Sequence, residues 1–152
     1  MKRKREKTPR QKLEAKLDRL FSRLVRQSGA DSQGICTCAS CGEKRHWKAI
    51  DCGHYYSRKH RSVRWDARNA RPQCKGCNSG FKRRIRFADP DDKIVEKLNE
   101  IRNNFAKTLR REGVDTIRLA EDARQIKLWT LPELEEMADE FEELIEQNGF
   151  EK

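Results

Sequence analysis

Cys38-Ala-Ser-Cys41 and Cys74-Lys-Gly-Cys77 enclose a stretch of the chain whose only Gly-His pair is Gly53-His54. Each Cys-x-x-Cys pair presents two sulfur atoms from one tight turn, and four thiolates complete the tetrahedral shell of structural zinc. The two pairs therefore predict a structural zinc site. Because a shell of four thiolates leaves no open coordination position, any chemistry must come from the residues between the pairs, chiefly His54.

The spacer between Cys41 and Cys74 has 32 residues, whereas about 15–20 separate the pairs of a usual two-knuckle zinc site. The longer spacer has room for a hairpin and a loop. Cys36 offers an alternative ligand to Cys38. The two-residue spacing from Cys38 to Cys41 matches that of the second pair and favours Cys38, which leaves Cys36 and Cys52 as free thiols.

The composition of the chain limits the size of its core and indicates its partner. Of 152 residues, 35% are hydrophobic and 39% are charged, and this apolar share is below the roughly 45–50% of globular chains. A small core held by metal fits, because structural zinc contributes about 10–16 kcal/mol to folding. The net charge of +10 favours a polyanionic partner, nucleic acid before a membrane surface.

The sequence indicates a cytoplasmic protein that does not enter the membrane. It contains no apolar run of about 18 residues that could span a bilayer, and its basic N-terminus lacks the apolar segment of a secretory signal. Reducing conditions in the cytoplasm favour metal ligands and free thiols over disulfides for the six cysteines.

The chain divides into one domain with extensions, and the predicted fold class is α+β. A basic tail (1–7) precedes an N-terminal helix (8–29). A compact, zinc-bound core (30–90) contains every cysteine and histidine. A helical C-terminal extension follows (91–152). Leucines and phenylalanines at helical spacing support both flanking helical regions.

Capping boxes mark where two of these helices begin. Thr8 and Gln11 can satisfy each other's backbone at the start of the first helix, with Pro9 at the first helical position. Thr130 and Glu133 repeat this pattern before the last helix. Within the core we expect short strands near 47–56 and 62–65 and a short basic helix over about 75–86. A further short helix is expected over about 115–126.

The residues around the second cysteine pair extend the pattern. Gly53-His54-Tyr55 is followed by Asn69, and then by Gln73-Cys74-Lys-Gly-Cys77-Asn78. This combination resembles the HNH (His-metal finger) nucleases and, more narrowly, the NinG (Rap) recombination endonucleases of lambdoid phages. The resemblance is strong over residues 36–80 and weaker from Trp129 onward. It implies a zinc-stabilised ββα-metal core.

The resemblance also implies roles for individual residues. His54 takes the position of the general base, and a neutral imidazole with a pKa near 6.5 suits proton transfer at neutral pH. Asn69 takes the position that holds the loop by backbone hydrogen bonds, and Asn78 that of a ligand for a catalytic Mg²⁺ or Mn²⁺. Asp51 is a second candidate ligand. Because strand residues an odd number apart point to opposite faces, Asp51 reaches the same site only if a bulge or turn intervenes.

The function that the resemblance implies is hydrolysis of phosphodiester bonds in DNA, in branched or single-strand-containing recombination intermediates, leaving 5′-phosphate and 3′-hydroxyl ends. If the chain is phage-encoded, its location is the host-cell cytoplasm. A run of basic residues around the candidate site includes one acid, Asp66, and can contact phosphates without regard to sequence. Its candidate DNA-binding residues are Arg58, Lys59, Arg61, Arg64, Arg68, Lys82, Arg83 and Arg84.

Two other functions share these features. A non-catalytic, zinc-stabilised DNA-binding module would have the same cysteines and basic surface, but it would need neither His54 nor Asn78. An assembly factor that binds nucleic acid would use the C-terminal helices and bind a partner without cleavage. A homodimer is compatible with each of these functions.

Overall fold

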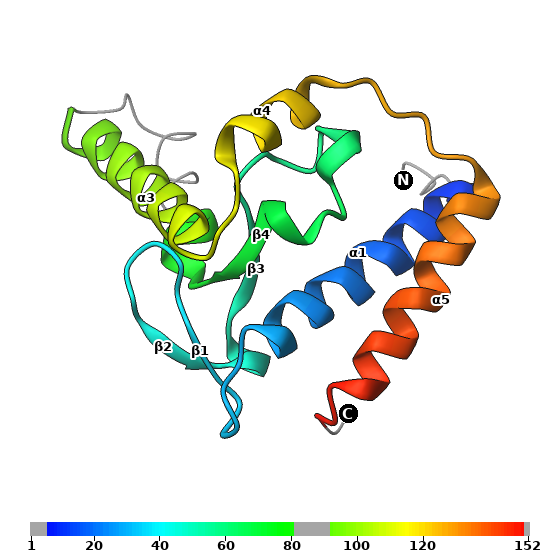
Figure 1. The fold of residues 1–152 in the computed structure, drawn as a ribbon, viewed down its shortest axis with the longest axis horizontal. Helices are drawn as coiled ribbons and strands as arrows, with labels where there is room; N and C mark the ends of the chain where they lie inside the picture. The colour runs from blue at the N-terminus through cyan, green and yellow to red at the C-terminus, as the bar shows by residue number, and fades with distance from the viewer. Residues whose placement is uncertain (1–5, 81–91, 151–152) are drawn as a thin grey trace, which may run out of the picture.

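Helices α1 (Pro9–Ser28) and α5 (Leu131–Gln147) pack together on one side of two small β-hairpins, and α3 (Asp92–Arg111) lies on the other side (Figure 1). The computed structural model describes residues 6–80 and 92–150. Helix α4 (Thr116–Arg124) follows α3 and packs against the loop of the second hairpin. The mixture of helices and small antiparallel sheets confirms the α+β class.

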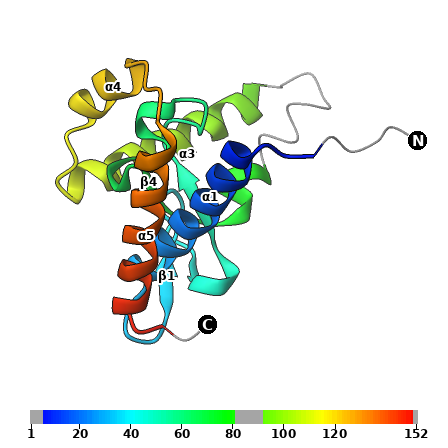
Figure 2. The ribbon, with the colours of Figure 1, turned by 90° about the vertical axis from the view of Figure 1, so that its right-hand side faces the viewer.

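The ends of the chain form a helical pair although they are far apart in the sequence (Figure 2). Leu17 and Phe21 of α1 are buried against Leu134 and Phe141 of α5. Their spacing, four residues in α1 and seven in α5, places them on one face of each helix. Both predicted capping boxes are present, at Thr8 and at Thr130. The N-terminal helix predicted over 8–29 is thus confirmed within one residue at each end.

Four short strands form two separate antiparallel hairpins. In the first, β1 (Ile35–Thr37) pairs with β2 (Lys44–His46). In the second, β3 (Asp51–His54) pairs with β4 (Ala70–Gln73), with Asp51 opposite Gln73 and His54 opposite Ala70. The strand expected over 47–56 is therefore shorter, because a helical turn, η1 (Trp47–Ala49), occupies its first residues.

The strand expected at 62–65 is wrong, because this segment contains a helical turn, η2 (Arg61–Val63). The partner of β3 is β4, further along the chain. Val63 and Trp65 are buried, as a strand residue would be. The turn buries both without a neighbouring strand, because the side chain of Asn69 binds the Val63 carbonyl at 2.9 Å.

Helices α3 and α4 cover the side of the hairpins that faces away from α1 and α5. Ile101 of α3 packs on the cysteines of both pairs, and Phe105 and Leu109 pack with Val63 and Leu119. Helix α3 ends at Arg111, and Gly113 in the turn that follows has a φ of +82°, a left-handed conformation that favours glycine. Helix α4 confirms the short helix predicted over about 115–126.

The segment after the second cysteine pair begins as predicted. A short π-helical turn, η4 (Gly76–Gly80), occupies the first part of the basic helix expected over about 75–86, and the remainder lies outside the described residues. Within residues 6–80 and 92–150, no helix is both long and apolar enough to cross a membrane.

Candidate functional site

The thiols of both cysteine pairs meet at one point between the hairpins. The sulfur atoms of Cys38, Cys41, Cys74 and Cys77 all lie within 4.8 Å of one another, and the Cys41 and Cys74 sulfurs are 3.7 Å apart. Three of the four side chains are buried, and Cys41 is exposed. Four converging thiols suit a structural metal, and zinc is the ion that most often takes such a set.

The first knuckle is built by the turn that joins β1 to β2. Gly42 has a φ of +77°, and its N–H donates to the Cys38 carbonyl at 3.0 Å, which closes the turn. The second pair is held against the first by the Cys74 N–H, which donates to the Cys38 sulfur at 3.3 Å. A thiolate that accepts a backbone N–H bond is stabilised as a ligand, because such bonds favour the charged form.

The remaining two cysteines lie outside this cluster. Cys36 is buried with Trp47 and Ile50, and its thiol donates to the Arg26 carbonyl at 3.0 Å. The alternative ligand set with Cys36 is thereby disfavoured. Burial raises the pKa of the Cys52 thiol to about 12, so that it stays protonated and packs as a small apolar group.

A cleft of about 700 Å³ contains the three polar residues that the chemistry would need, Asp51, His54 and Asn78. It lies between the C-terminal half of α1, turn η1, strand β3 and turn η4. Its other polar and charged lining residues are Asp18, Ser22, Arg26, Lys48, Ser57, Arg58 and Lys75.

Asp51 and Asn78 meet in this cleft. The Asn78 amide nitrogen donates to a carboxylate oxygen of Asp51 at 3.1 Å, and both side chains are partly buried. Asn78 is positioned because its backbone N–H donates to the Cys74 carbonyl at 2.9 Å. The second cysteine pair thus fixes Asn78 directly, and carboxylate and carboxamide oxygens are suitable ligands for Mg²⁺ or Mn²⁺.

No bulge is needed to bring Asp51 to the same cleft as His54. The pairing of β3 with β4 is regular from residue 51 to residue 54. Asp51 lies on one face of the strand and Cys52 and His54 on the other, yet all three line the cleft. The cleft therefore follows the edge of β3 that β4 leaves unpaired, where residues from both faces are accessible.

The His54 ring is held in one tautomer by the loop that follows it. Its Nε2 lies 3.0 Å from the Arg64 carbonyl oxygen, which can only accept, so Nε2 carries the proton and Nδ1 is left with a lone pair. The ring also packs against Phe21 of α1. Burial lowers the pKa of His54 and the charges of Arg58 and Arg64 lower it further, against the opposing effect of the Arg64 hydrogen bond.

Asn69 is fully buried and holds the loop between β3 and β4. Its side-chain oxygen accepts from the Tyr56 N–H at 2.8 Å, and its amide donates to the carbonyls of Tyr56 and Val63 at 2.9 Å each. These are backbone hydrogen bonds of the kind that the resemblance implied for this position. Asn69 contacts the loop and does not line the cleft, so it acts by positioning.

Gly53, the residue before His54, packs closely on a buried glutamine. A Cβ atom at this position would lie 2.3 Å from Oε1 and 2.7 Å from Cβ of Gln73. Gln73 is itself fixed, because its amide donates to the Ser40 hydroxyl at 2.8 Å. Only glycine fits here, so β3 cannot carry a carboxylate directly before His54. The carboxylate that β3 does carry is that of Asp51.

Gly53→Ala should therefore destabilise the second hairpin by about 1–3 kcal/mol, the usual cost of overpacking. Gly76→Ala is a matched control, because the nearest atom to its added Cβ is 3.9 Å away. Urea unfolding at a fixed zinc concentration measures both. Equal stability of the two variants would contradict the close packing of Gly53 on Gln73.

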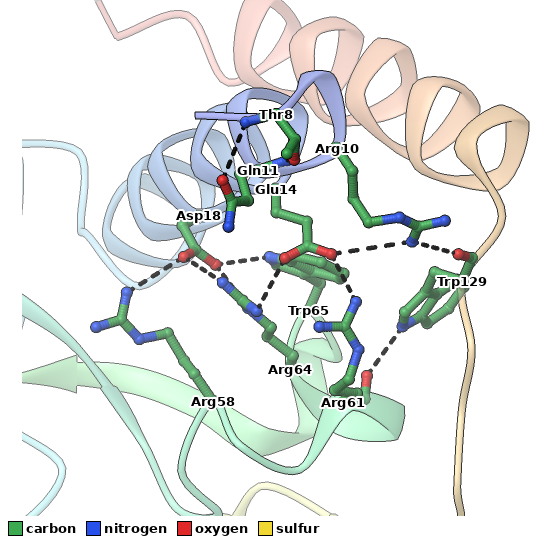
Figure 3. A network of polar contacts seen from close by, with 10 residues as sticks. All are labelled: Thr8, Arg10, Gln11, Glu14, Asp18, Arg58, Arg61, Arg64, Trp65 and Trp129. Atoms are coloured by element: carbon green, nitrogen blue, oxygen red, sulfur yellow. Dashed lines mark hydrogen bonds and ion pairs between the residues drawn. The ribbon is translucent and has the colours of Figure 1, made fainter. Parts of the chain in front are cut away.

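Three of the arginines predicted to contact DNA form ion pairs with acids of α1 (Figure 3). Asp18 accepts two bonds from the Arg64 guanidinium, at 3.0 and 2.7 Å, and one from the Trp65 ring at 2.9 Å. Glu14 accepts from Arg61 at 2.6 Å. Arg58 makes a longer contact with Asp18, at 3.3 Å, and its side chain is 62% exposed.

The remaining arginines and lysines of the basic run differ in their surroundings. Arg68 pairs with Asp66 and with Asp122 of α4, and Arg71 pairs with Glu112 of α3. The carboxylates that pair with the run therefore come from α1, α3 and α4 as well as from Asp66 within it. Lys59 is exposed. Three further candidates lie outside the described residues: Lys82, Arg83 and Arg84.

The sequence contained a signal for this network. Glu14 and Asp18 are the only acids of a helix otherwise rich in lysine and arginine, and a spacing of four residues places them on one face. Two isolated acids on one face of a basic helix indicate a basic partner within the protein. Arg26 and Lys48, which also line the cleft, were missed because nothing in the local sequence marks them.

Asp18→Asn should lower the free energy of unfolding by about 2–3 kcal/mol at pH 7, since it weakens charge-assisted bonds to Arg64 and Trp65. Burial alone would raise the pKa of Asp18, but its bonds to Arg64 and Trp65 hold it below the ordinary 3.8. This stability is present above pH 3.8 and is lost as the pH falls through the folded pKa. The difference between wild type and variant should therefore shrink in acid.

Denaturant unfolding at several pH values measures this difference, with Asp139→Asn on the exposed face of α5 as the control for loss of a surface acid. A wild-type advantage that is constant from pH 7 to pH 3 would contradict the ion-pair origin of the stability.

When compared with known proteins, the chain matches no family model, no curated protein and no solved structure.

Proposed function

We propose that this chain is a metal-dependent DNA endonuclease of the HNH type, in which β3, β4 and η4 form the ββα-metal unit. The observation that carries the proposal is the cleft shared by His54, Asp51 and Asn78, with Asn78 bonded to Asp51 at 3.1 Å. A zinc-stabilised module that only binds DNA would have no need for an oriented imidazole beside an oxygen-rich pair. The sequence resemblance to the phage recombination endonucleases supports the same function.

In the proposed reaction, Nδ1 of His54 accepts a proton from a water molecule. The water oxygen attacks phosphorus in line, and the bond from phosphorus to the 3′ oxygen breaks. The departing 3′ oxygen takes a proton from solvent, which leaves a 5′-phosphate and a 3′-hydroxyl. Arg64 supports this step through its carbonyl, because the bond to Nε2 keeps the lone pair on Nδ1. The lowered pKa of His54 keeps the imidazole ring neutral at physiological pH.

The oxygens of Asp51 and Asn78 would hold the catalytic Mg²⁺ or Mn²⁺. When bound, such an ion stabilises negative charge on the phosphoryl and leaving oxygens. The thiol cluster has a separate, structural role, because a shell of four sulfurs has no position for substrate. Asn69, Arg61, Arg64 and Arg68 would position the loop that carries the base.

Cleavage of labelled linear, flap and four-way-junction DNA by the purified protein tests this proposal. We expect nicks in the presence of Mg²⁺, a preference for the branched substrates, and no product in the presence of EDTA added after zinc is bound. Binding to all three DNAs without cleavage in Mg²⁺ or Mn²⁺ would favour the non-catalytic DNA-binding module.

A further inference from the structure

Four cations line the cleft that contains Asp51, His54 and Asn78. We call them the cleft rim: Arg26, Lys48, Arg58 and Lys75. Arg26 belongs to the last turn of α1 and Lys48 to turn η1. Both therefore lie outside the basic run that was recognised in the sequence, which begins at Arg58. The fold alone places these two beside the candidate catalytic residues.

Two cations of the rim, Arg26 and Lys75, differ from the arginines that fasten the loop, and a third, Arg58, makes only a 3.3 Å contact with Asp18 from a side chain that is 62% exposed. Among the described residues, no carboxylate pairs with Arg26 or with Lys75, whereas Arg64 shares Asp18 through two short bonds. Arg26 is nevertheless fixed, because its guanidinium donates to the carbonyls of Ser22 and Trp47 at 3.0 Å each. Its position is set by neutral groups, which leave its positive charge uncompensated.

The acids of the cleft do not cancel this charge. Among the residues that the structure describes, two carboxylates, Asp18 and Asp51, line the cleft with the four cations. Asp18 is occupied by the Arg64 guanidinium and the Trp65 ring, and Asp51 contacts Asn78. An anion that enters the cleft therefore meets a surplus of positive charge around one partly buried carboxylate, and such a surplus suits a phosphodiester beside a divalent ion.

We propose that the cleft rim binds the sugar-phosphate backbone of the DNA strand to be cut, so that this strand crosses the cleft between α1 and η4. The inference rests on the proposed nuclease function and assigns its substrate contacts. It gives the N-terminal helix a direct role in binding DNA, and it leaves Arg61, Arg64 and Arg68 to fasten the loop.

Removal of the two exposed lysines tests the rim without disturbing Arg26. The variant Lys48→Gln/Lys75→Gln is compared with Lys44→Gln/Lys107→Gln, which removes the same charge from exposed positions that do not line the cleft. Zinc content and circular dichroism check that each variant is folded. The probes are a labelled duplex and a labelled four-way junction in EDTA, titrated at several salt concentrations so that no cleavage occurs.

Each lost phosphate contact lowers the slope of log affinity against log salt by about 1. We therefore expect the slope to fall by about 2 for the rim variant, about 1 for Lys75→Gln alone, and to stay near that of the wild type for the control. A rim variant with the wild-type slope would overturn the proposed binding of DNA by the cleft rim, even if the wild type nicks DNA. If the rim variant has a lower slope but the wild type never nicks DNA, the proposed nuclease function is overturned, whereas the binding of DNA by the rim is supported.

Discussion

Cys74→Ser should prevent zinc binding and abolish the cooperative unfolding of the two hairpins. The strands have only three or four residues each, and an isolated two-stranded hairpin is marginally stable in water. Because structural zinc contributes about 10–16 kcal/mol to folding, loss of one thiolate removes more than such a core can supply. Metal analysis and thermal unfolding followed by circular dichroism would measure both effects.

Cys36→Ser is the matched control for this change. Cys36 is also buried and lies two residues from a proposed ligand, but its thiol bonds to the Arg26 carbonyl and not to the cluster. We expect this variant to keep one zinc per chain and most of its stability, since serine can still donate to that carbonyl. Loss of zinc in Cys36→Ser with retention in Cys38→Ser would show that the ligand set is wrong.

His54→Ala should slow single-turnover cleavage of DNA by a factor of about 10²–10⁴, the usual contribution of a general base. The protein should remain folded with zinc bound, because His54 is only partly buried and makes one hydrogen bond. His60→Ala, in the loop that follows β3, is the control. His60 bonds the Ala123 carbonyl at 3.0 Å and does not line the cleft. Undiminished cleavage by zinc-loaded His54→Ala would exclude His54 as the base.

The dependence of cleavage on pH provides a second measure of the same residue. Because burial lowers the pKa of His54 from 6.5, the neutral base persists in the folded protein below pH 6.5. The acid limb of the rate profile should therefore have its midpoint below 6.5 and should be absent from the residual activity of His54→Ala. The same shift costs stability in acid, since below pH 6.5 the unfolded chain binds the proton more readily.

The elements that the sequence predicted well are those defined by local signals. The Thr8 and Thr130 capping boxes, each followed by apolar residues at helical spacing, predicted α1 to within one residue at each end and predicted where α5 begins. The spacing within the two Cys-x-x-Cys pairs likewise predicted which four thiols meet, and it favoured Cys38 over Cys36.

The partner of β3 could not be predicted in the same way. Ala70–Gln73 contains a proline and no apolar alternation, so it lacks the pattern of a strand, whereas the segment 62–65 offered buried Val63 and Trp65. The pairing is set instead by Asn69, which gathers the loop by its side chain, and by the cysteine pair that follows β4. Such contacts between distant residues have no periodic signature in the sequence.

The electrostatics of the site depended even more on tertiary structure. The basic run was correctly recognised, but its division between Arg64, which is neutralised by Asp18, and Lys75, which faces the cleft, is decided by where α1 packs. The inclusion of Arg26 in the cleft has the same origin. Sequence alone could predict a positive surface but not which of its charges are available to a ligand.

Anomalous X-ray scattering from a crystal grown with zinc and soaked in Mn²⁺ would locate both kinds of metal directly. We expect a zinc peak among the sulfurs of the two cysteine pairs and a manganese peak in the cleft, bound by the oxygens of Asp51 and Asn78 beside His54. Zinc bound away from the four thiols, or manganese found only outside the cleft, would contradict the proposed arrangement.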